Sequence, residues 1–252
     1  MSKERRVSVI MPIHNEAEYL PSSLESLKKI EDQIFEHIFI LDRCTDSSEA
    51  IVRKHFPNAN VIKKDIVRWQ NSYAENLQLG FQHSTSDIVC IHDADILSTK
   101  EMFTMLLIEL VNTNNASVSP NLLTYKYASF LNHLYYYWEK TFDLGVGREP
   151  WGGLRLIKRS ALESVGGFKD VITPDTQLDI DLRGAGYNVK FMKDATCWHM
   201  REFTFDKAVK GQIQSGKMRK QIKMPFPRVL AHAVIRLRPF VIYGYLKQGA
   251  NC

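Results

Sequence analysis

Short apolar segments alternate along the N-terminal half of the chain with segments whose apolar residues recur at helical spacing. The apolar segments are residues 7–13, 34–41 apart from Glu36 and His37, 60–62 and 88–91. Helical spacing is expected at 20–30, where it is set by Leu20, Leu24, Leu27 and Ile30, and near 48–55 and 71–83. This alternation predicts an α/β fold with a mostly parallel sheet covered by helices.

Two carboxylates, Asp93 and Asp95, follow the apolar segment at 88–91. Residues just beyond the carboxyl end of such a strand lie where open α/β sheets bind ligands. Because side chains i and i+2 of an extended segment point the same way, the pair can converge on one hard divalent cation. A solvated turn, or a cap for the helix that opens at Ser98-Thr99, is the alternative interpretation.

Polar residues also end the first two strands. His14, Asn15 and Glu16 follow the first strand, and Asp42 ends the second. If the strands are parallel, all of these side chains meet at one edge of the sheet. Asp42 can equally serve as a helix N-cap, and Glu16 can be a first-turn charge favoured by the helix dipole.

An ordered set of short motifs spans residues 7 to 200. The set consists of Val9-Ile-Met-Pro-Ile-His-Asn-Glu16, Asp42-Arg-Cys-Thr-Asp46, Ala74 with Asn76, Asp93-Ala-Asp95, Trp151-Gly-Gly153, Gly166-Gly-Phe168, Pro174-Asp-Thr-Gln-Leu178, Arg183 and Gly186-Tyr187. It resembles glycosyltransferase family 2 and implies the GT-A fold, a Rossmann-like central sheet flanked by helices. Two features depart from the family pattern. The loop after the second strand is one residue shorter than usual, and the usual Glu-Asp pair is Pro174-Asp175.

The resemblance implies a donor site at the carboxyl edge of the sheet. Asp93 and Asp95 would bind a divalent cation, Mn²⁺ or Mg²⁺, and His199 stands where some relatives supply a third ligand; a structural or surface role is its alternative. The residues implied to bind the nucleotide are Pro12, His14, Asn15, Glu16, Asp42 and Asp93. Arg68 is added because it can reach a phosphate, although a solvated arginine is the simpler interpretation.

The resemblance also implies an acceptor side and a base. Asp175 would take the proton of the acceptor hydroxyl, although Thr173-Pro174 resembles a helix start and Asp175 can simply be a first-turn acid. Trp151, Gly152 and Gly153 would line the acceptor side, since glycines there let the backbone approach a sugar. An ordinary tight turn is the alternative for the glycines.

Together these residues predict a metal-dependent glycosyltransferase that moves a sugar from a UDP- or GDP-linked donor, with inversion at the anomeric carbon. The acceptor would be the hydroxyl of a sugar or glycolipid, or a lipid phosphate. Retention stays open because other GT-A enzymes share the donor half. A sugar-phosphate nucleotidyltransferase and a non-catalytic protein with a degenerate nucleotide site are the rivals. The Gly-rich, basic loop of nucleotidyltransferases is missing after the first strand, and intact Asp93, Asp95 and Asp175 oppose the degenerate site.

Charge is distributed unevenly along the 252 residues, although the net charge is only +5. Residues 1–206 hold 23 Lys and Arg against 28 Asp and Glu, whereas 207–252 hold 10 Lys and Arg and no acid. We therefore predict a GT-A catalytic domain at 1–204, with a nucleotide-binding half at about 1–98 and an acceptor half at about 99–204. A basic helical extension at 205–252 follows, with helices near 205–219 and 229–246 and an interruption at Pro239.

Three interpretations of the extension stay open. Its helices can pack on the catalytic domain or on a second subunit in a homodimer. Residues 207–247 can instead contact a membrane surface near a lipid-linked acceptor, because cationic and aromatic side chains favour anionic headgroups. Lys217, Arg219 and Lys220 can also close over the donor pyrophosphate as a lid. Nucleic-acid binding is not expected, because the carboxylate-rich loops would repel a phosphate backbone.

The remaining composition indicates a cytoplasmic protein, peripheral on the membrane at most. Cys44, Cys90, Cys197 and Cys252 lack metal-type spacing, which fits reduced thiols, and no signal-peptide region precedes the first strand. A run of 18 uncharged apolar residues is absent from the sequence. In the aromatic segment 125–138, helical spacing of Tyr127, Phe130, Leu131, Leu134 and Trp138 predicts a core-facing stripe rather than a sugar- or lipid-binding surface.

Overall fold

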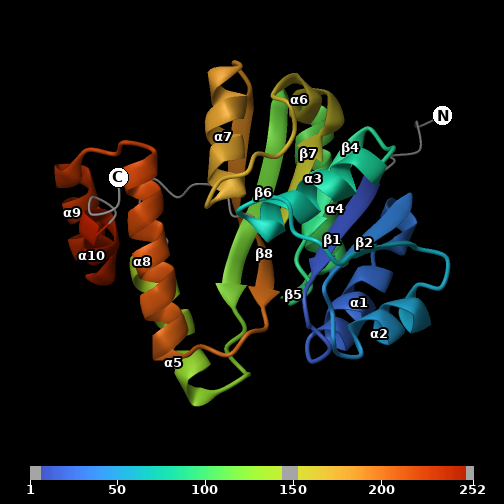
Figure 1. The fold of residues 1–252 in the computed structure, drawn as a ribbon, viewed down its shortest axis with the longest axis horizontal. Coiled ribbons are helices and arrows are strands. Elements are labelled where there is room, and N and C mark those ends of the chain that lie inside the picture. Colours follow the sequence, from blue (N-terminus) through green and yellow to red (C-terminus); the bar gives the residue numbers. More distant parts are fainter. Residues whose placement is uncertain (1–6, 144–152, 248–252) are drawn as a thin grey trace. The chain divides into compact units, whose positions relative to one another are not determined.

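The computed structural model describes residues 7–143 and 153–247, and its centre is an eight-stranded sheet (Figure 1). The strand order is β3-β2-β1-β4-β7-β6-β8-β5. The strands are β1 (Val7–Ile13), β2 (Glu36–Asp42), β3 (Asn60–Lys64), β4 (Ile88–His92), β5 (Ile96–Leu97), β6 (Asn115–Thr124), β7 (Leu154–Lys158) and β8 (Asn188–His199). Strands β3, β2, β1 and β4 pair in parallel, and β7 then runs antiparallel to both β4 and β6. The predicted α/β class is confirmed.

The chain divides into two compact units. The first contains Met1–Leu123 with Glu149–Met200 and holds nearly all of the sheet, and the second contains Thr124–Arg148 with Arg201–Cys252. The described helices of the first unit are α1 (Leu20–Lys28), η1 (Glu31–Gln33), α2 (Ser48–His55), α3 (Ser72–His83), α4 (Lys100–Asn112), α6 (Arg159–Ser164) and α7 (Pro174–Gly184). A domain boundary at residue 204 stays a prediction.

The core of the first unit lies in two layers because side chains alternate between the faces of each strand. Val9 and Met11 of β1 belong to a cluster with apolar residues of α1, α2 and α4. Ile10 of the same strand belongs to a second cluster with residues of α3, α6 and α7. Helix α2 therefore covers one face of the sheet and α3 the other, and the strand order β3-β2-β1-β4 reverses direction at β1. Open α/β sheets bind ligands at such a reversal.

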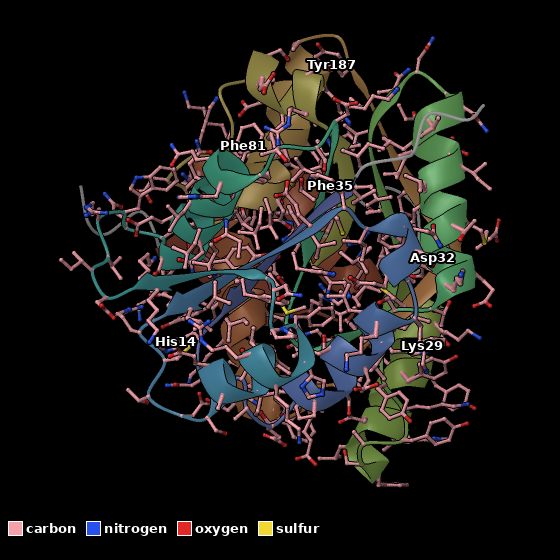
Figure 2. The ribbon with its side chains drawn as sticks, turned by 90° about the vertical axis from the view of Figure 1, so that its right-hand side faces the viewer. His14, Lys29, Asp32, Phe35, Phe81 and Tyr187 are labelled. Atoms are coloured by element: carbon pink, nitrogen blue, oxygen red, sulfur yellow. The ribbon has the colours of Figure 1, made fainter. Side chains whose placement is uncertain are left out.

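The two ends of β1 have different roles. At its amino end, the backbone N–H of Phe35 donates to the carbonyl of Val7 at 2.9 Å and joins β1 to the start of β2. Figure 2 shows Phe35 at this end and His14 at the opposite one, where the polar loops gather. The carboxyl ends of the parallel strands thus share one edge.

Local caps account for several helix starts in the first unit. Asn71 caps α3 by accepting from the backbone N–H groups of Tyr73 and Ala74, and Thr99 caps α4 by accepting from Met102. Since Thr99 performs this task, the alternative in which Asp93 or Asp95 caps that helix is wrong. Helix α7 begins at Pro174, as the sequence predicts.

The second unit is helical in its described part and is organised around a buried asparagine. Its helices are α5 (Phe130–Trp138), η2 (Glu139–Asp143), α8 (Phe205–Gln221), α9 (Phe226–Ile235) and α10 (Phe240–Lys247). Asn132 is fully buried, donates to the carbonyls of Tyr125 and Arg201, and accepts from the N–H of Phe203 at 2.7 Å. Helix α5 is thereby fastened to the segment that precedes α8.

The predicted core-facing stripe of α5 is wrong in this structure. Phe130 is 76% exposed and Leu134 is 52% exposed, and Tyr127 and Leu131 are exposed as well. Tyr135 instead stacks on Phe203, with ring centroids 4.2 Å apart. Helical spacing correctly predicts which residues share a face, but it does not reveal whether another element covers that face.

The basic C-terminal segment forms the three helices α8, α9 and α10, with an interruption at Pro239 as predicted. In the described residues no helix has the length and apolarity needed to span a bilayer. Helices α8 and α10 cross in close contact at Gly216 and Gly244. A Cβ atom at Gly216 would overlap the carbonyl oxygen of Val241, and one at Gly244 would overlap that of Ile213.

We expect Gly216→Ala to destabilise the helical unit by about 1–3 kcal/mol, because the added methyl group must push two helix backbones apart. Gly211→Ala is the matched control in the same helix, since nothing lies within 4 Å of its Cβ position. It should raise the free energy of unfolding by up to about 1 kcal/mol through helix propensity. Denaturant unfolding measures both changes, and equal stabilisation by the two variants would contradict the close crossing.

Candidate active site at the carboxyl edge of the parallel strands

The loops that follow β1 and β2 are bonded to each other. Nδ1 of His14 donates to the carbonyl oxygen of Asp42 at 2.6 Å, and the Asn15 side chain accepts from the N–H of Thr45 at 2.8 Å. Asn15 has a φ of 54°, a left-handed conformation that asparagine tolerates better than most residues. Glu16 donates its backbone N–H to Ser48 Oγ. The predicted nucleotide-binding residues of both loops therefore form one connected rim.

Pro12 lies inside this rim, buried in β1 and in register with Ile40 of β2. Proline has no N–H to donate and is rarely found in a central strand. It lies one residue before the end of β1, next to the polar loop that follows.

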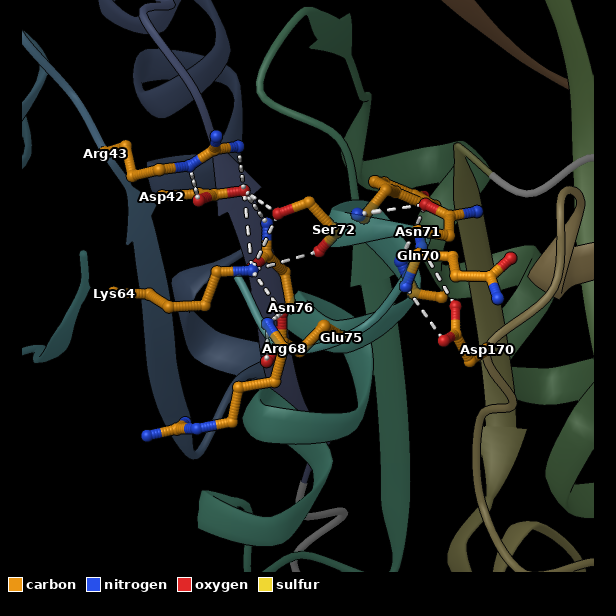
Figure 3. Close-up of polar contacts among 12 residues, drawn as sticks. Asp42, Arg43, Lys64, Arg68, Gln70, Asn71, Ser72, Glu75, Asn76 and Asp170 are labelled. Atoms are coloured by element: carbon orange, nitrogen blue, oxygen red, sulfur yellow. Dashed lines mark hydrogen bonds and ion pairs between the residues drawn. The ribbon is translucent and has the colours of Figure 1, made fainter. Parts of the chain in front are cut away.

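Asp42 lies at the centre of a polar network and is 2% exposed (Figure 3). Its carboxylate accepts from Arg43 Nε at 2.8 Å, from Asn76 Nδ2 at 3.1 Å and from the hydroxyl of Ser72, and Lys64 Nζ lies 3.5 Å away. Burial alone would raise the pKa of Asp42, but these donors and the lysine charge outweigh it and lower the pKa to about 2. The side chain is a permanent carboxylate, able only to accept hydrogen bonds.

Lys64 and Glu75 extend the polar network around Asp42. Lys64 is 5% exposed, and its Nζ lies 3.1 Å from Glu75 Oε2 and 2.7 Å from Ser72 Oγ. Glu75 also accepts from the backbone N–H of Arg68. The Arg68 side chain is exposed and extends away from Asp42 in Figure 3, so the network uses the backbone of this residue and not its guanidinium group.

Sequence reasoning did not single out Lys64 or Glu75. A lysine at the end of a short strand and a glutamate in a first helical turn are ordinary surface residues, so neither gives a signal by itself. Only the pairing of β2 with β3, which places Lys64 opposite Asp42, brings the charges together.

A second polar contact ties the start of α3 to the loop before α7. The Asp170 carboxylate accepts from the backbone N–H groups of Gln70 at 2.8 Å and Asn71 at 2.9 Å (Figure 3). Asn71 in turn donates its side-chain amide to the carbonyl of Val171 at 2.6 Å. The segment that leads into Asp175 is thus fixed to the helix that carries Ser72 and Tyr73.

Asp93 and Gly153 approach each other closely. The N–H of Asp93 donates to the Gly153 carbonyl at 2.8 Å. A Cβ at Gly153 would lie 3.1 Å from Asp93 Oδ2 and 2.9 Å from Ile96 Cδ1, so glycine is required for this approach. The neighbouring Trp151 and Gly152, predicted for the acceptor side, lie outside the described residues.

Tyr73 joins the three predicted carboxylates into one site. Its hydroxyl donates to Asp93 Oδ1 at 2.9 Å. Burial raises the pKa of Tyr73 well above its ordinary value, and the negative charges of Asp93, Asp175 and Asp95 raise it further. All three acids therefore lie close enough to Tyr73 to influence it. The motif formed by Ala74 and Asn76 lies beside Tyr73 in the sequence but does not by itself indicate a role for the tyrosine.

Asp95 and His199 meet because β5 pairs with β8, which places Ile96 opposite His199. Asp95 is 2% exposed, and its Oδ2 lies 3.0 Å from His199 Nε2. The backbone carbonyl of Asp95 also accepts from Met200 at 2.8 Å. The structure thus brings together the distant histidine and the second carboxylate of the predicted metal site.

The donor set at this edge fits a hard divalent cation. Carboxylate oxygens suit Mg²⁺ and Mn²⁺, and an imidazole is acceptable to Mn²⁺. Across the described ranges, no group of three or more His, Cys, Asp or Glu side chains is placed so that it could hold a metal ion by itself, and this includes the predicted set of Asp93, Asp95 and His199. Mg²⁺ is commonly bound by one or two carboxylates together with substrate phosphates, so an incomplete protein set agrees with an ion shared with a phosphorylated ligand.

Asp175 occupies the first turn of α7, where its side chain is half-buried. Helix α7 packs on the sheet through Leu178 and Leu182, which are 2% and 0% exposed. The face of the helix is thereby set, and the negative charge of Asp175 contributes to the raised pKa of Tyr73. Both interpretations of Asp175, as a first-turn acid and as a base, agree with this position.

A sheet that changes helical face beside β1, with acids at its carboxyl edge and an antiparallel β7, is the architecture of the GT-A glycosyltransferases. The chain belongs to glycosyl transferase family 2, since residues 8–166 match that family. The probable glycosyltransferase YdaM of Bacillus subtilis strain 168 is 26% identical over 231 residues, 81% of this chain and 53% of YdaM. The chain therefore spans about half the length of this curated relative.

Solved structures agree on the fold. The mannosyltransferase PcManGT from Pyrobaculum calidifontis, in complex with GDP-Man and Mn²⁺, has a TM-score of 0.68 at 20% identity, covering 98% of this chain and 76% of that chain. Glucosyl-3-phosphoglycerate synthase from Mycobacterium tuberculosis, in complex with Mg²⁺ and UDP, has a TM-score of 0.62 at 18% identity. The match covers 88% of this chain and 80% of the synthase chain. The predicted family and fold are confirmed, whereas the roles of individual residues stay predictions.

We expect Lys64→Met to lower the free energy of unfolding by about 3–5 kcal/mol at neutral pH, because two buried carboxylates lose their cation. The pKa values of Asp42 and Glu75 lie below their ordinary values of 3.8 and 4.5. The stability that they contribute is present above those values and is lost as the pH falls below them. The deficit of the variant should therefore be largest above about pH 5 and shrink toward pH 3.

Denaturant unfolding across this pH range measures the effect. Lys63→Met is the control, since Lys63 is exposed and pairs with Glu49 on the surface. It should cost less than about 1 kcal/mol at every pH. A Lys64→Met deficit that does not change with pH would contradict the proposed charge network.

Proposed function

We propose that the protein is a metal-dependent glycosyltransferase that moves a sugar from a UDP- or GDP-linked donor to an acceptor, with inversion at the anomeric carbon. The observation that carries the proposal is the hydrogen bond from Tyr73 to Asp93, with the Asp95–His199 pair at the same carboxyl edge of the sheet. Membership in glycosyl transferase family 2 supports it.

Asp93, Asp95 and His199 would hold the cation. When bound, the ion supplies charge neutralisation for the leaving nucleoside diphosphate. Tyr73 keeps Asp93 in place through its hydroxyl, and His199 orients Asp95. These contacts set the positions of the two carboxylates, and a bound cation would lower the repulsion between them.

Asp42 and the rim from Pro12 to Glu16 would bind the nucleoside. A carboxylate that is always ionised can accept a hydrogen bond from an N–H of the base. Both Asp42 oxygens already accept from protein donors. A carboxylate has about four lone-pair sites, so it can still accept from a base. The backbone N–H of Arg68 donates to Glu75, so its exposed guanidinium group would be the part that reaches a phosphate.

Asp175 would be the base. The half-buried side chain of Asp175 would accept the proton of the attacking hydroxyl. Gly153 lines the same area because it contacts Asp93. The acceptor would be a sugar hydroxyl, a glycolipid or a lipid phosphate. Inversion follows if Asp175 acts as a base and no protein nucleophile intervenes.

The ligands named for structural neighbours guide the choice of donors for testing. PcManGT is described with GDP-Man and Mn²⁺, and the mycobacterial synthase with Mg²⁺ and UDP. Nucleotide titration calorimetry should therefore use UDP, GDP, UDP-glucose and GDP-mannose, with Mn²⁺ present and then chelated. Binding of one nucleotide only with metal is expected. Binding of a nucleoside triphosphate with release of pyrophosphate from a sugar phosphate would favour a nucleotidyltransferase instead.

Two variants separate metal binding from chemistry. Asp95→Ala should lose the metal-dependent part of nucleotide binding, because one side of the cation site is removed. Asp175→Asn should bind the nucleotide normally but release it from the nucleotide sugar about 10²- to 10⁴-fold more slowly, as expected for loss of a general base.

The control is Asp181→Asn, on the same helix α7 and with its carboxylate on the surface salt bridge to Lys169. It should retain both properties. Normal nucleotide release by Asp175→Asn would assign the base elsewhere, and the absence of any nucleotide binding by the unchanged protein would favour a degenerate site.

We further propose that α9 and α10 contact an anionic membrane surface. The inner face of these helices is buried through Val229, Ala233 and Val241. Their outer apolar side chains are exposed: Val234, Ile235, Leu237, Phe240 and Leu246. Residues 207–252 hold 10 basic and no acidic side chains, a charge pattern that complements anionic headgroups.

Vesicle flotation with phosphatidylcholine, alone and mixed with phosphatidylglycerol, tests this contact. The protein should float with the anionic vesicles, and Ile235→Glu should release it. Ile66→Glu is the matched control, because Ile66 is 65% exposed in the first unit and Ile235 is 66% exposed. Concentration-dependent dimerisation that Ile235→Glu abolishes, without vesicle binding, would assign the surface to a second copy of the chain.

A further inference from the structure

A fully buried arginine lies directly behind the proposed base. Arg155, on β7 opposite Ile91 of β4, has 0% of its surface exposed. Its Nη2 lies 2.6 Å from Oδ1 of Asp179, which is 1% exposed, and its Nη1 donates to the backbone carbonyl of Asp175 at 3.3 Å. One guanidinium group therefore contacts both the main chain of the first turn of α7 and a carboxylate in the next turn.

Stability alone does not account for this pair. Removing two charges from water costs more than their attraction generally returns, and well-packed apolar residues often replace such a pair without loss. The surroundings of α7 offer that solution, because Leu178 and Leu182 already pack on the sheet. An ion pair at this place instead provides direction, since the planar fork of arginine bonds in a defined geometry.

The start of β7 also lies beside the proposed metal site. Gly153, two residues before Arg155, accepts from the backbone N–H of Asp93. The residue immediately before β7 therefore contacts Asp93, and Arg155 on β7 contacts α7 two residues later. Asp179 follows Asp175 by four residues, so the two lie on one face of the helix. The separation between Asp93 and Asp175 is thus set through Arg155.

We propose that Arg155 and Asp179 form a clamp that positions Asp175 against the donor site. Neither residue touches the reacting atoms, so both are positioning residues. The inference rests on the proposed role of Asp175 as the base. Misplacing a base by about 1 Å can cost on the order of 10²-fold in rate, which makes the clamp detectable in turnover.

The test uses the full chain and the double variant Arg155→Met/Asp179→Leu, which replaces the ion pair by apolar side chains. The double variant should unfold at nearly the unchanged temperature and bind UDP or GDP with Mn²⁺ within about twofold. It should release nucleotide from UDP-glucose or GDP-mannose on the order of 10²-fold more slowly. Hydrogen exchange should become faster in the first turn of α7.

Two further variants sharpen the result. Arg155→Lys keeps a cation against Asp179 but lacks the second arm that reaches the Asp175 carbonyl, so we expect an intermediate loss of turnover with the fold retained. Lys169→Met removes the surface salt bridge of the same helix to Asp181 and should leave turnover and exchange unchanged. Arg155→Met alone should fold poorly because it leaves Asp179 buried without its cation.

The outcomes distinguish the clamp from the proposed function. Turnover and exchange equal to those of the unchanged protein in the double variant would overturn the clamp, while the transferase activity would stand. If Asp175→Asn releases nucleotide as fast as the unchanged protein, Asp175 is not the base and the clamp loses its purpose. Slower turnover of the double variant with unchanged nucleotide affinity would support both the clamp and the role of Asp175 as the base.

Discussion

The mutual repulsion of carboxylates gathered at one edge of the sheet is the constraint on which the rest of the site depends. Like charges a few ångströms apart raise each other's pKa unless donors or cations compensate for them. Each acid has its own protein donor here: Arg43 and Lys64 at Asp42, Tyr73 at Asp93, and His199 at Asp95. These donors come from different strands and helices, so the edge exists only when the whole sheet is assembled.

The donors differ in a way that matters for function. Asp42 is surrounded by full positive charges and keeps a pKa of about 2, which makes it a fixed acceptor. Asp93 accepts a hydrogen bond from the neutral hydroxyl of Tyr73, and a neutral donor compensates charge less than a cation does. Full positive charges thus lie beside the acid proposed for the nucleoside, whereas a hydroxyl is among the donors of an acid proposed for the cation.

The sequence predicted most elements of the first unit because apolar periodicity reports directly on burial there. The strand at Val7–Ile13 and the helix at Ser48–His55 have the expected bounds. The edge residues were predictable because parallel strands align their carboxyl ends. Lys64, Tyr73 and Arg155 were not, since their roles arise from partners far along the chain. The exposed stripe of α5 was mispredicted because periodicity does not say what covers a helix.

Pro174 gives the departure from the family pattern a physical meaning. Where relatives usually have a glutamate before the aspartate, this chain has a buried proline at the first position of α7. Proline removes a charge from the crowded edge and fixes the backbone at the helix start, which needs no N–H from that residue. Arg155 then holds the carbonyl of the next residue, Asp175. Arg155 thus holds Asp175 through its main chain, and the Asp175 carboxylate is left for its proposed role as the base.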